Sequence, residues 1–470
     1  MDSEQLPSRD NNENNEFPPT PYNTENSSEM DDVDQEPVFI DMKDAIEVNV
    51  DDEDVPMEEE DEEVSESEAP TDVIDMSMAK LESHTGPVYS VSAHYDPTSR
   101  SLSFLSGGGD DRSFLHRIIR GSAPSTLPLT HAHTDTVACS AFNMDFIGET
   151  NTPKLAAVGG YDGAIVLYDA DTGNKLKELE GPSDVEWLCF HPKGGSVLLA
   201  GSVADGTIWM YHIPTSKCLQ VFVGHESGVT AGSFTPDGRW AVSASSDGTV
   251  RVWAPRTGVS KHVFRLGDAG LTSMAVGGGS DSQLVIVGAE DGMAHVCHIG
   301  TKKVVASLRH YEPPSNINDE DEELELPMSV EAVGFASSAV NPNWCATGGV
   351  DGVLKIWDLS KDGQCRQVCR HEAASSVGGI TRLRWHPTLP LVFTSCSDGA
   401  IRLWDARNGT LLQTLTGHSD MINDMDIIFI DPQHAGGTAV IVSGSDDKTA
   451  RIYEIDINVV LQSAQATSGP

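Results

Sequence analysis

Residues 393–405 read FTSCSDGAIRLWD, and this stretch decides the fold. It begins with a short run of apolar and small residues, turns at Asp398-Gly399, and continues as a second short apolar run. Asp-Gly between two such runs is typical of a tight turn between antiparallel strands, because glycine adopts a positive φ without steric cost. The stretch therefore predicts two neighbouring strands of one antiparallel sheet.

The same strand–turn–strand unit recurs along the chain. Three further copies are VSASSDGTVRVW at 242–253, ATGGVDGVLKIWD at 346–358 and VSGSDDKTARIY at 442–453. Eight turn aspartates lie 42 to 60 residues apart: Asp111, Asp162, Asp205, Asp247, Asp291, Asp351, Asp398 and Asp447. Repeats of a little over forty residues, each with four short strands, indicate a β-propeller. We therefore expect an all-β propeller of eight blades, with seven as the alternative if the weak first unit (106–118) is irregular.

The ends of the chain predict how the ring closes. The eight innermost strands are expected to begin near Val88, Val137, Val185, Val229, Leu271, Val330, Ile380 and Ile422. The last unit ends after its third strand, and Asp72–Leu81 is placed to supply the missing outer strand and so remove both sheet edges. The predicted organisation is a disordered acidic tail at 1–70, a propeller at 71–458 and a C-terminal tail at 459–470.

Dipeptides at the repeat boundaries resemble those of the WD-repeat family. Trp357-Asp358 and Trp404-Asp405 are intact WD pairs, and Gly224-His225 and Gly417-His418 match the GH pairs that precede them. The resemblance implies that His, Ser or Thr, Asp and Trp form a hydrogen-bonded chain inside each blade. The implied sets are His225, Ser243, Asp247 and Trp253; His371, Thr394, Asp398 and Trp404; and His418, Ser443, Asp447 and Tyr453. These residues recur in several blades, so we interpret them as satisfied buried polar groups rather than as catalytic triads.

The net charge of −42 is concentrated in two segments. Residues 1–70 hold 26 acids and two bases, and an insert between blades 5 and 6, residues 311–327, adds seven acids and no base. Their removal leaves −11 on the rest of the chain. Such acidity argues against nucleic acid and anionic membrane as ligands and favours a basic partner. The composition of the tail predicts disorder, because it cannot bury enough apolar surface to offset its ordering entropy.

Motifs for catalysis or cofactor binding are missing from the sequence. GxxxxGK[ST], HExxH and a GxSxG with suitable partners do not occur. His131 and His133 fall where a structural histidine is expected, and Cys365 and Cys369 have no second ligand pair. We therefore expect no enzyme activity, no metal and no cofactor. The eight scattered cysteines, with no secretory signal and no apolar run long enough to span a bilayer, favour a protein with reduced thiols in the cytoplasm, with the nucleus as a further compartment.

The binding face is predicted from three positions per blade that project from WD propellers. They lie on either side of the first apolar residue of the inner strand and just before the turn aspartate. No Lys or Arg occupies these positions, whereas acids occupy six and tyrosines two: Asp110, Asp184, Glu186, Glu290, Glu331, Asp446, Tyr89 and Tyr161. The insert is expected to emerge on this same face. Several acids converging on one basic segment can hold it and accelerate its association.

Longer stretches resemble one subgroup of WD proteins. They are DVEWLCFHPKGGSVLLAGSVADGTIWMY at 184–211, SGGGDDRSF at 106–114 and LWDARNGTLLQTLTGHSD at 403–420. The subgroup contains the animal angio-associated migratory cell protein and a fungal chaperone of a large-subunit ribosomal protein of the L-ten family. The resemblance implies a monomeric chaperone for 60S assembly that binds the basic N-terminal segment of that ribosomal protein. The alternative is a WD scaffold or substrate receptor that binds another basic peptide, such as a histone tail or degron.

Overall fold

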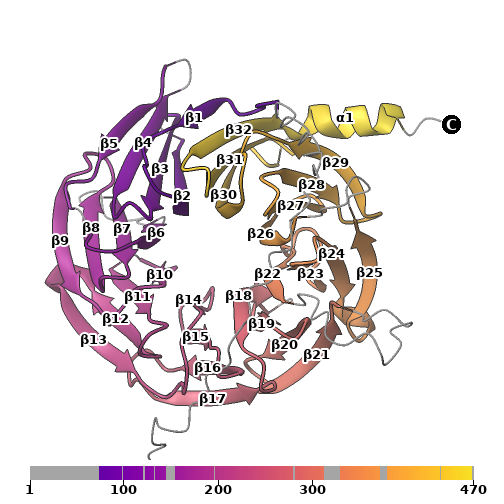
Figure 1. Ribbon diagram of the computed structural model, residues 1–470. Helices are drawn as coiled ribbons and strands as arrows, with labels where there is room; N and C mark the ends of the chain where they lie inside the picture. The colour runs from indigo at the N-terminus through magenta and orange to yellow at the C-terminus, as the bar shows by residue number, and fades with distance from the viewer. Residues whose placement is uncertain are drawn as a thin grey trace, which may run out of the picture. The chain divides into compact units, whose positions relative to one another are not determined.

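A computed structural model describes residues 74–467, except 98, 120–121, 132, 144–153, 195, 279–280, 312–328, 371–377 and 434–435. These residues form eight four-stranded antiparallel sheets, which Figure 1 shows as the blades of a ring. The predicted eight-bladed all-β propeller is confirmed, and the weak first unit is a complete blade. The predicted tail at 1–70 lies outside the described residues, as does the acidic insert apart from Tyr311.

Each blade consists of four strands, from the ring axis to the circumference. The inner strands are β2 (Val88–Asp96), β6 (Val137–Phe142), β10 (Trp187–Phe190), β14 (Ala231–Phe234), β18 (Leu271–Gly278), β22 (Val330–Phe335), β26 (Ile380–Trp385) and β30 (Ile422–Ile430). The second strands are β3 (Ser101–Gly108), β7 (Leu155–Gly160), β11 (Val197–Gly201), β15 (Ala241–Ala244), β19 (Leu284–Ala289), β23 (Trp344–Gly349), β27 (Leu391–Cys396) and β31 (Thr438–Ser445).

The third strands are β4 (Ser113–Ile119), β8 (Ala164–Asp169), β12 (Ile208–His212), β16 (Thr249–Trp253), β20 (Met293–His298), β24 (Leu354–Asp358), β28 (Ile401–Asp405) and β32 (Ala450–Asp456). The outer strands are β5 (Ser125–Pro128), β9 (Lys175–Glu180), β13 (Lys217–Phe222), β17 (Ser260–Arg265), β21 (Lys303–Arg309), β25 (Gln364–Cys369), β29 (Thr410–Leu415) and, for blade 8, β1 (Ala79–Leu81). Short 3₁₀ turns, η2 (Ile213–Thr215) and η3 (Leu359–Lys361), follow β12 and β24.

The hydrophobic core lies between neighbouring blades. One cluster, for example, joins Trp344 and Ile356 of blade 6 to Ile380 and Trp404 of blade 7. Because the second strand of a blade is covered on both faces, every residue of β27 is buried. This position explains the small residues in the stretch that decides the fold, since both faces of a buried strand must fit against a neighbouring blade.

The turn and the dipeptide of the repeat each have a local structural role. Gly399 has a φ of +76°, which a residue with a Cβ rarely adopts, although Asp111 (+62°) and Lys448 (+69°) take the same position in blades 1 and 8. A register shift between the third and outer strands falls directly at Trp404, and the same shift falls at Trp253 and Trp357. Such bulges re-aim a side chain, and here they accompany the indole that points into the blade.

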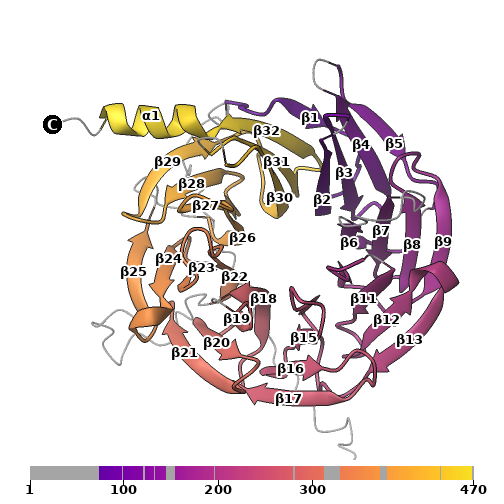
Figure 2. The same ribbon diagram turned by 180° about the vertical axis from the view of Figure 1, so that it is seen from behind.

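The N-terminal strand closes the ring, as predicted. β1 pairs antiparallel with β32, with Ala79 opposite Ile452 and Leu81 opposite Ala450. Ahead of the strand, the Met76 amide donates to the Thr416 carbonyl at 2.9 Å, and Asp75 forms an ion pair with Arg451. Figures 1 and 2 show β1 beside β32 at the point where the two ends of the ring meet.

The predicted C-terminal tail was wrong in one respect. Residues Ile457–Thr467 form helix α1, which lies at the outside of the ring beside β29 in Figure 2. Ile457 and Val460 are buried against Leu389 and Leu412 of blade 7. The sequence signal for this helix was the spacing of its apolar residues by three and four positions. The signal was too weak to predict a helix, because so short a helix is stable only against the surface that it covers. No helix among the described residues is long and apolar enough to span a membrane.

Candidate peptide-binding face

The connections that lead into the inner strands and the turns between second and third strands lie on one side of the ring, which we call the upper face. Both ends of the acidic insert reach it, since the Tyr311 amide donates to Gly292 O at 3.2 Å and Ser329 O accepts the Val350 amide at 3.1 Å. Seven of the eight predicted residues belong to this face, and we call them the upper rim: Tyr89, Tyr161, Asp184, Glu186, Glu290, Glu331 and Asp446. Tyr89 and Tyr161 are 39% and 41% exposed, which leaves their rings open to a ligand.

Glu186 and Tyr161 form a pair between blades 2 and 3. The Tyr161 hydroxyl donates to Glu186 Oε2 at 2.9 Å. Burial raises the pKa of Glu186 above its usual range, and the neighbouring Asp184 carboxylate raises it further, while the Tyr161 hydrogen bond and Arg382 oppose the shift. A carboxylate that is half-buried beside another acid is stabilised by an incoming cation, because the cation relieves both costs.

Asp184 contributes to the structure of its own loop. Its Oδ1 accepts a hydrogen bond from the Ser202 hydroxyl and from the Ala204 amide at 3.1 Å, and its Oδ2 accepts from the Val203 amide at 3.3 Å. These bonds hold the turn between β11 and β12. Asp184 therefore adds negative charge to the upper rim, but hydrogen bonds within its own loop already fix the position of its carboxylate.

The other rim acids make fewer contacts. Glu290 is exposed at the turn of blade 5. Glu331 is half-buried and accepts a hydrogen bond from Ser329, and Asp446 accepts one from Asn423 Nδ2 at 2.7 Å. None of the three forms an ion pair with another described residue. Their charge is consequently uncompensated by a direct cationic partner.

Asp110 does not belong to the upper rim, which corrects the prediction. Its side chain is 6% exposed and accepts hydrogen bonds from His84 at 2.8 Å and from the Thr85 amide at 2.8 Å. Asp110 is the turn aspartate of blade 1, and Asp111 occupies the position with positive φ that glycine takes elsewhere. The adjacent pair of aspartates shifted the sequence alignment by one residue, so Gly109 stands at the rim position.

The upper face also carries charges that the three-position rule did not identify. Exposed acids in the connections to the inner strands are Asp135, Glu226, Asp268 and Asp420. Their signal was present in the sequence, because three of them follow a blade histidine by one or two residues. Exposed cations also occur: Arg112 and Lys448 at the turns of blades 1 and 8, and Arg265 and Arg309 at the upper ends of outer strands. The upper face therefore carries both acidic and basic side chains toward its edge, whereas every charged residue of the upper rim is an acid.

Blade 4 contains the complete polar chain that the WD resemblance implied. His225 contacts Asp247 at 2.9 Å and Ser243 at 2.8 Å, and the Trp253 indole N–H donates to Ser243 Oγ at 2.8 Å. Burial alone would raise the pKa of Asp247, but hydrogen bonds from Thr249, the Glu226 amide and His225 outweigh it and lower that pKa to about 2. Burial lowers the pKa of His225. The set satisfies buried polar groups and holds the turn.

Blades 7 and 8 depart from the expected chain. His371 lies outside the described residues; in blade 7 the Trp404 indole donates to Thr394 at 3.0 Å, and Asp398 pairs with Arg402. In blade 8 His418 contacts Asp447 and Ser443, each at 2.8 Å. The Tyr453 hydroxyl is buried without a hydrogen-bond partner, so tyrosine does not reproduce the contact of the indole.

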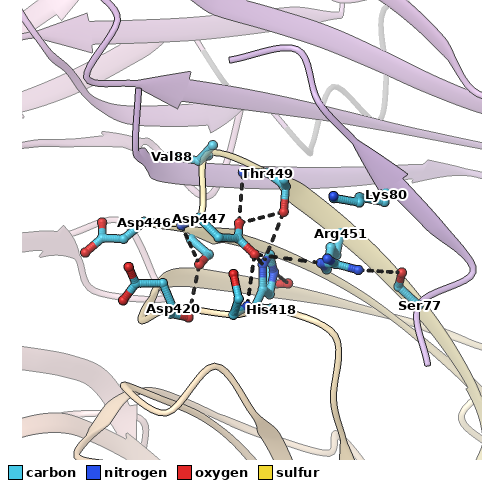
Figure 3. Close-up of polar contacts among 12 residues, drawn as sticks. Ser77, Lys80, Val88, His418, Asp420, Asp446, Asp447, Thr449 and Arg451 are labelled. Atoms are coloured by element: carbon cyan, nitrogen blue, oxygen red, sulfur yellow. Dashed lines mark hydrogen bonds and ion pairs between the residues drawn. The ribbon is translucent and has the colours of Figure 1, made fainter. Parts of the chain in front are cut away.

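Blade 8 is also connected to the closing strand. Figure 3 shows Arg451 between Asp447 on one side and Ser77 on the other. The Arg451 guanidinium donates to Ser77 Oγ at 3.3 Å and pairs with Asp75. Since Asp447 in turn contacts His418, the polar chain of the last blade extends into the N-terminal segment that closes the ring.

Two polar chains were missed, because blade 1 has histidine in place of tryptophan and the histidine of blade 6 follows Arg309 rather than glycine. In blade 1, His84 contacts Ser106 at 2.8 Å, and His116 contacts Ser106 at 2.9 Å from the position that tryptophan holds in blade 4. In blade 6, His310 contacts Thr347 at 2.7 Å and Trp357 donates to Thr347 at 2.8 Å. The recurring ten-residue spacing between the hydroxyl and the ring, as in Ser243 and Trp253, was the signal that identifies both.

Blade 2 shows what happens when the central hydroxyl is missing. His133 contacts Asp162 at 3.0 Å, but Val158 stands where blade 4 has Ser243. His133 Nε2 and the Tyr168 hydroxyl are both buried without a hydrogen-bond partner. His133 is thus a structural residue, and the described residues contain no group of three or more His, Cys, Asp or Glu side chains placed to hold a metal ion.

The inner strands of blades 7, 8 and 1 are joined by charged side chains. Arg382 Nε donates to Asp424 Oδ1 at 3.1 Å, and the two carboxylates Asp424 and Asp426 accept the backbone amides of Val91 and Ala93 at 3.0 and 2.9 Å. Alternating charges in TRLRW and NDMDI (381–385 and 423–427) were the sequence signal. These contacts fix neighbouring inner strands, which do not share a sheet.

Comparison with known proteins agrees with the fold. The family model "WD domain, G-beta repeat" matches residues 216–254, 331–358, 363–405 and 409–454. The angio-associated migratory cell protein of Canis lupus familiaris is 33% identical over 374 residues, which cover 79% of this chain and 78% of the relative. Among solved structures, Saccharomyces cerevisiae Sqt1 superposes with a TM-score of 0.67 at 18% identity, covering 81% of this chain and 99% of Sqt1.

A further similar structure is that of Chaetomium thermophilum Sqt1 bound to the N-terminus of the ribosomal protein L10. It has a TM-score of 0.64 at 18% identity and covers 81% of this chain and all of that chain. At this identity the structural likeness concerns the fold, whereas the animal relative shares sequence across most of both chains. The chain therefore belongs to the angio-associated migratory cell protein family of WD-repeat propellers.

Proposed function

We propose that this protein is a ribosome-assembly chaperone that binds the basic N-terminal segment of a newly made large-subunit ribosomal protein of the L10 family. The observation that carries the proposal is the upper rim, where Glu186, Glu290 and Glu331 present carboxylates that form no ion pair with another described residue. The L10-bound structure of Chaetomium thermophilum Sqt1, which has the same fold, supports the choice of partner.

The chemistry of the rim suits a reversible complex. One exposed ion pair contributes only about 0.2–1 kcal/mol, so several must act together to hold a basic segment. Such a segment is built to contact rRNA phosphate, which competes for the same cations, and electrostatic complexes exchange readily as salt or phosphate rises. The proposed role needs no catalysis, metal or cofactor. It is that of a monomeric chaperone in the cytoplasm, where ribosomal proteins are made, with the nucleus as a second compartment.

The exposed tyrosines add an apolar component at the same place. Tyr161 is anchored by Glu186, so its ring is presented at a fixed position beside a carboxylate. Arginine and lysine are attracted both to a carboxylate and to the face of an aromatic ring. The pair therefore favours a segment in which cationic side chains are closely spaced.

The test is a direct binding measurement on the full chain. A fluorescent peptide of the N-terminal segment of L10 is titrated at rising salt, with a histone H3 tail peptide of equal net charge as competitor. We expect saturable binding of the L10 peptide that weakens steeply with salt and displacement by the H3 peptide only at large excess. Equal affinity for both peptides would support the general basic-peptide receptor instead, and no binding at low salt would exclude both functions.

A further inference from the structure

A hollow of about 320 Å³ lies at the end of the inner strands opposite the upper rim. It spans blades 5, 6 and 7, where the C-terminal halves of β18, β22 and β26 line it with Val276, Val333, Phe335, Leu383, Arg384 and Trp385. Inner strands run from the upper face, where the connections enter, to the other side of the ring. The hollow therefore opens on the lower face, away from the proposed site for the basic segment.

Small residues on two inner strands make room for this hollow. Ala275 and Gly334 line it where bulkier side chains would fill the space. A Cβ on Gly334 would lie 2.6 Å from Leu383 Cδ1, so the glycine also lets blade 7 approach blade 6 closely. The Trp385 indole N–H donates to Gly334 O at 3.3 Å and fixes the ring as one wall. The walls are thus aromatic and aliphatic, and they are held in place.

A single guanidinium gives the hollow its charge. Arg384 is exposed and lines the hollow, and within the described part of the chain it forms no ion pair. Its neighbour Arg382, two residues earlier on the same strand, is paired with Asp424 at 3.1 Å. The acid close to Arg384 is Asp426: its carboxylate accepts hydrogen bonds from the Ala93 amide at 2.9 Å and the Ile427 amide at 3.0 Å, and the charge of Arg384 opposes the rise in its pKa that burial causes. No carboxylate is among the residues that line the hollow, so its charge is that of Arg384.

We propose that this hollow is a second binding site, which takes a segment of a partner protein with an aromatic side chain next to an aspartate or glutamate. The aromatic ring packs against Phe335 and Trp385, and the carboxylate pairs with Arg384. Pockets of this size that combine apolar walls with one oriented polar group are typical of specific sites for small ligand groups. The proposal does not depend on the function of the upper rim, since the two sites lie on opposite faces and select opposite charges.

The test uses two capped dipeptides that differ by one charge, acetyl-Asp-Phe-amide and acetyl-Asn-Phe-amide. The full chain is labelled with 5-fluorotryptophan, and the fluorine signal of Trp385 is assigned by loss in W385F. We expect the Asp peptide to shift this signal saturably and the Asn peptide to bind about threefold more weakly, as one partly exposed ion pair allows. Arg384→Gln should abolish the difference between the peptides, and Arg384→Lys should retain it.

Arg382→Gln is the matched control, because it removes a guanidinium from the same strand that is already paired. It should leave the preference for the Asp peptide unchanged. No saturable shift of the Trp385 signal up to about 20 mM peptide would overturn the site. Equal affinities for the two peptides, or a preference that persists in Arg384→Gln, would overturn the role of Arg384.

Discussion

Carboxylates occupy two kinds of position in the ring, the blade interior and the upper rim, and they have opposite roles there. Inside the blades, Asp110, Asp247 and Asp447 are nearly buried and each contacts a histidine within 3 Å. On the upper rim, Glu186, Glu290 and Glu331 have no cationic partner among the described residues. The first group has satisfied its charge within the fold and stabilises it, whereas the second retains charge that a ligand can use.

The comparison predicts its largest effect inside blade 4. Asp247→Ala should lower the free energy of unfolding by about 3 kcal/mol, because it removes hydrogen bonds from His225, Thr249 and the Glu226 amide and leaves Nδ1 of the buried His225 without its carboxylate. Urea unfolding measures the loss.

The matched control is Asp291→Ala at the equivalent turn of blade 5. Asp291 is exposed and accepts a hydrogen bond from the Met293 amide at 2.9 Å, so we expect a loss of about 1 kcal/mol. Equal losses in the two variants would show that the polar chain of blade 4 adds no stability beyond the turn itself.

Reversal of the charge on the upper rim should weaken peptide binding and leave the stability of the fold unchanged. Glu290→Lys combined with Glu331→Lys should weaken binding of the L10 N-terminal peptide about thirtyfold, or about 2 kcal/mol, since two attractions become repulsions. The urea midpoint should stay within error of wild type because neither side chain forms an ion pair within the described ring. Fluorescence anisotropy measures the change in affinity, and urea unfolding measures the stability.

Asp171→Lys is the control for that variant. Asp171 lies in the loop between β8 and β9 on the lower face, and its side chain is 61% exposed. Reversal of one charge there, which is half of the change made in the rim variant, should leave peptide affinity within about twofold. A loss as large as that of the rim variant would mean that the rim acts only through net charge.

The rim and the blade interior should also respond differently to pH. The pKa of Glu186 is raised by burial, so its negative charge is lost as pH falls toward that raised value, above the usual range near 4.5. Peptide affinity should therefore decrease as pH falls from 7 toward 5, by at most about fivefold, which is the effect of one ion pair. In Glu186→Gln the affinity should be lower at pH 7 and nearly independent of pH.

Asp247 gives the contrasting case. Its folded-state pKa of about 2 is below the unfolded value near 3.8, so the stability it provides is present above the unfolded pKa and is lost only as pH falls through the folded one. Asp247 therefore adds no pH dependence between pH 7 and pH 5. If Glu186→Gln retains the full pH dependence of binding in that range, another group carries it.

The smallest effect is predicted for a substitution that completes the polar chain of blade 2. Val158→Thr places a hydroxyl between His133 Nε2 and the Tyr168 hydroxyl, both of which lack partners. We expect a gain of about 1 kcal/mol in the free energy of unfolding. Val166→Thr, at a buried position directly across from Val158 on β8, is the control and should lose stability. Loss of stability in both variants would contradict the role assigned to the missing hydroxyl.

The sequence was sufficient to predict the fold, because the same strand pattern recurs eight times. Asp-Gly turns, WD dipeptides and the short last unit predicted the blade count and the closing strand. It was less sufficient for single residues. Asp110 was misplaced because two adjacent aspartates fit the turn, and the chain of blade 1 was missed because His116 replaces tryptophan. The choice between the two aspartates is not decided by local sequence, since it depends on which side chain reaches His84.

The rim was predictable as a set of positions but not as a set of contacts. The sequence places Tyr161 and Glu186 25 residues apart, and only the ring brings them to 2.9 Å. The ion pair between Arg382 and Asp424 likewise joins two blades. The hollow beside Arg384 was not predicted, because it results from small residues on two strands, β18 and β22, that are distant in sequence.

The central claim is that the upper rim contacts the basic segment of the ribosomal protein. The most direct measurement replaces Tyr89 by the photocrosslinker benzoylphenylalanine and irradiates the full chain with the L10 N-terminal peptide. The comparison places the same crosslinker at Val259, an exposed residue between β16 and β17 on the lower face. The account predicts a covalent adduct from Tyr89 and none from Val259. An adduct from Val259 alone, with peptide affinity intact, would contradict it.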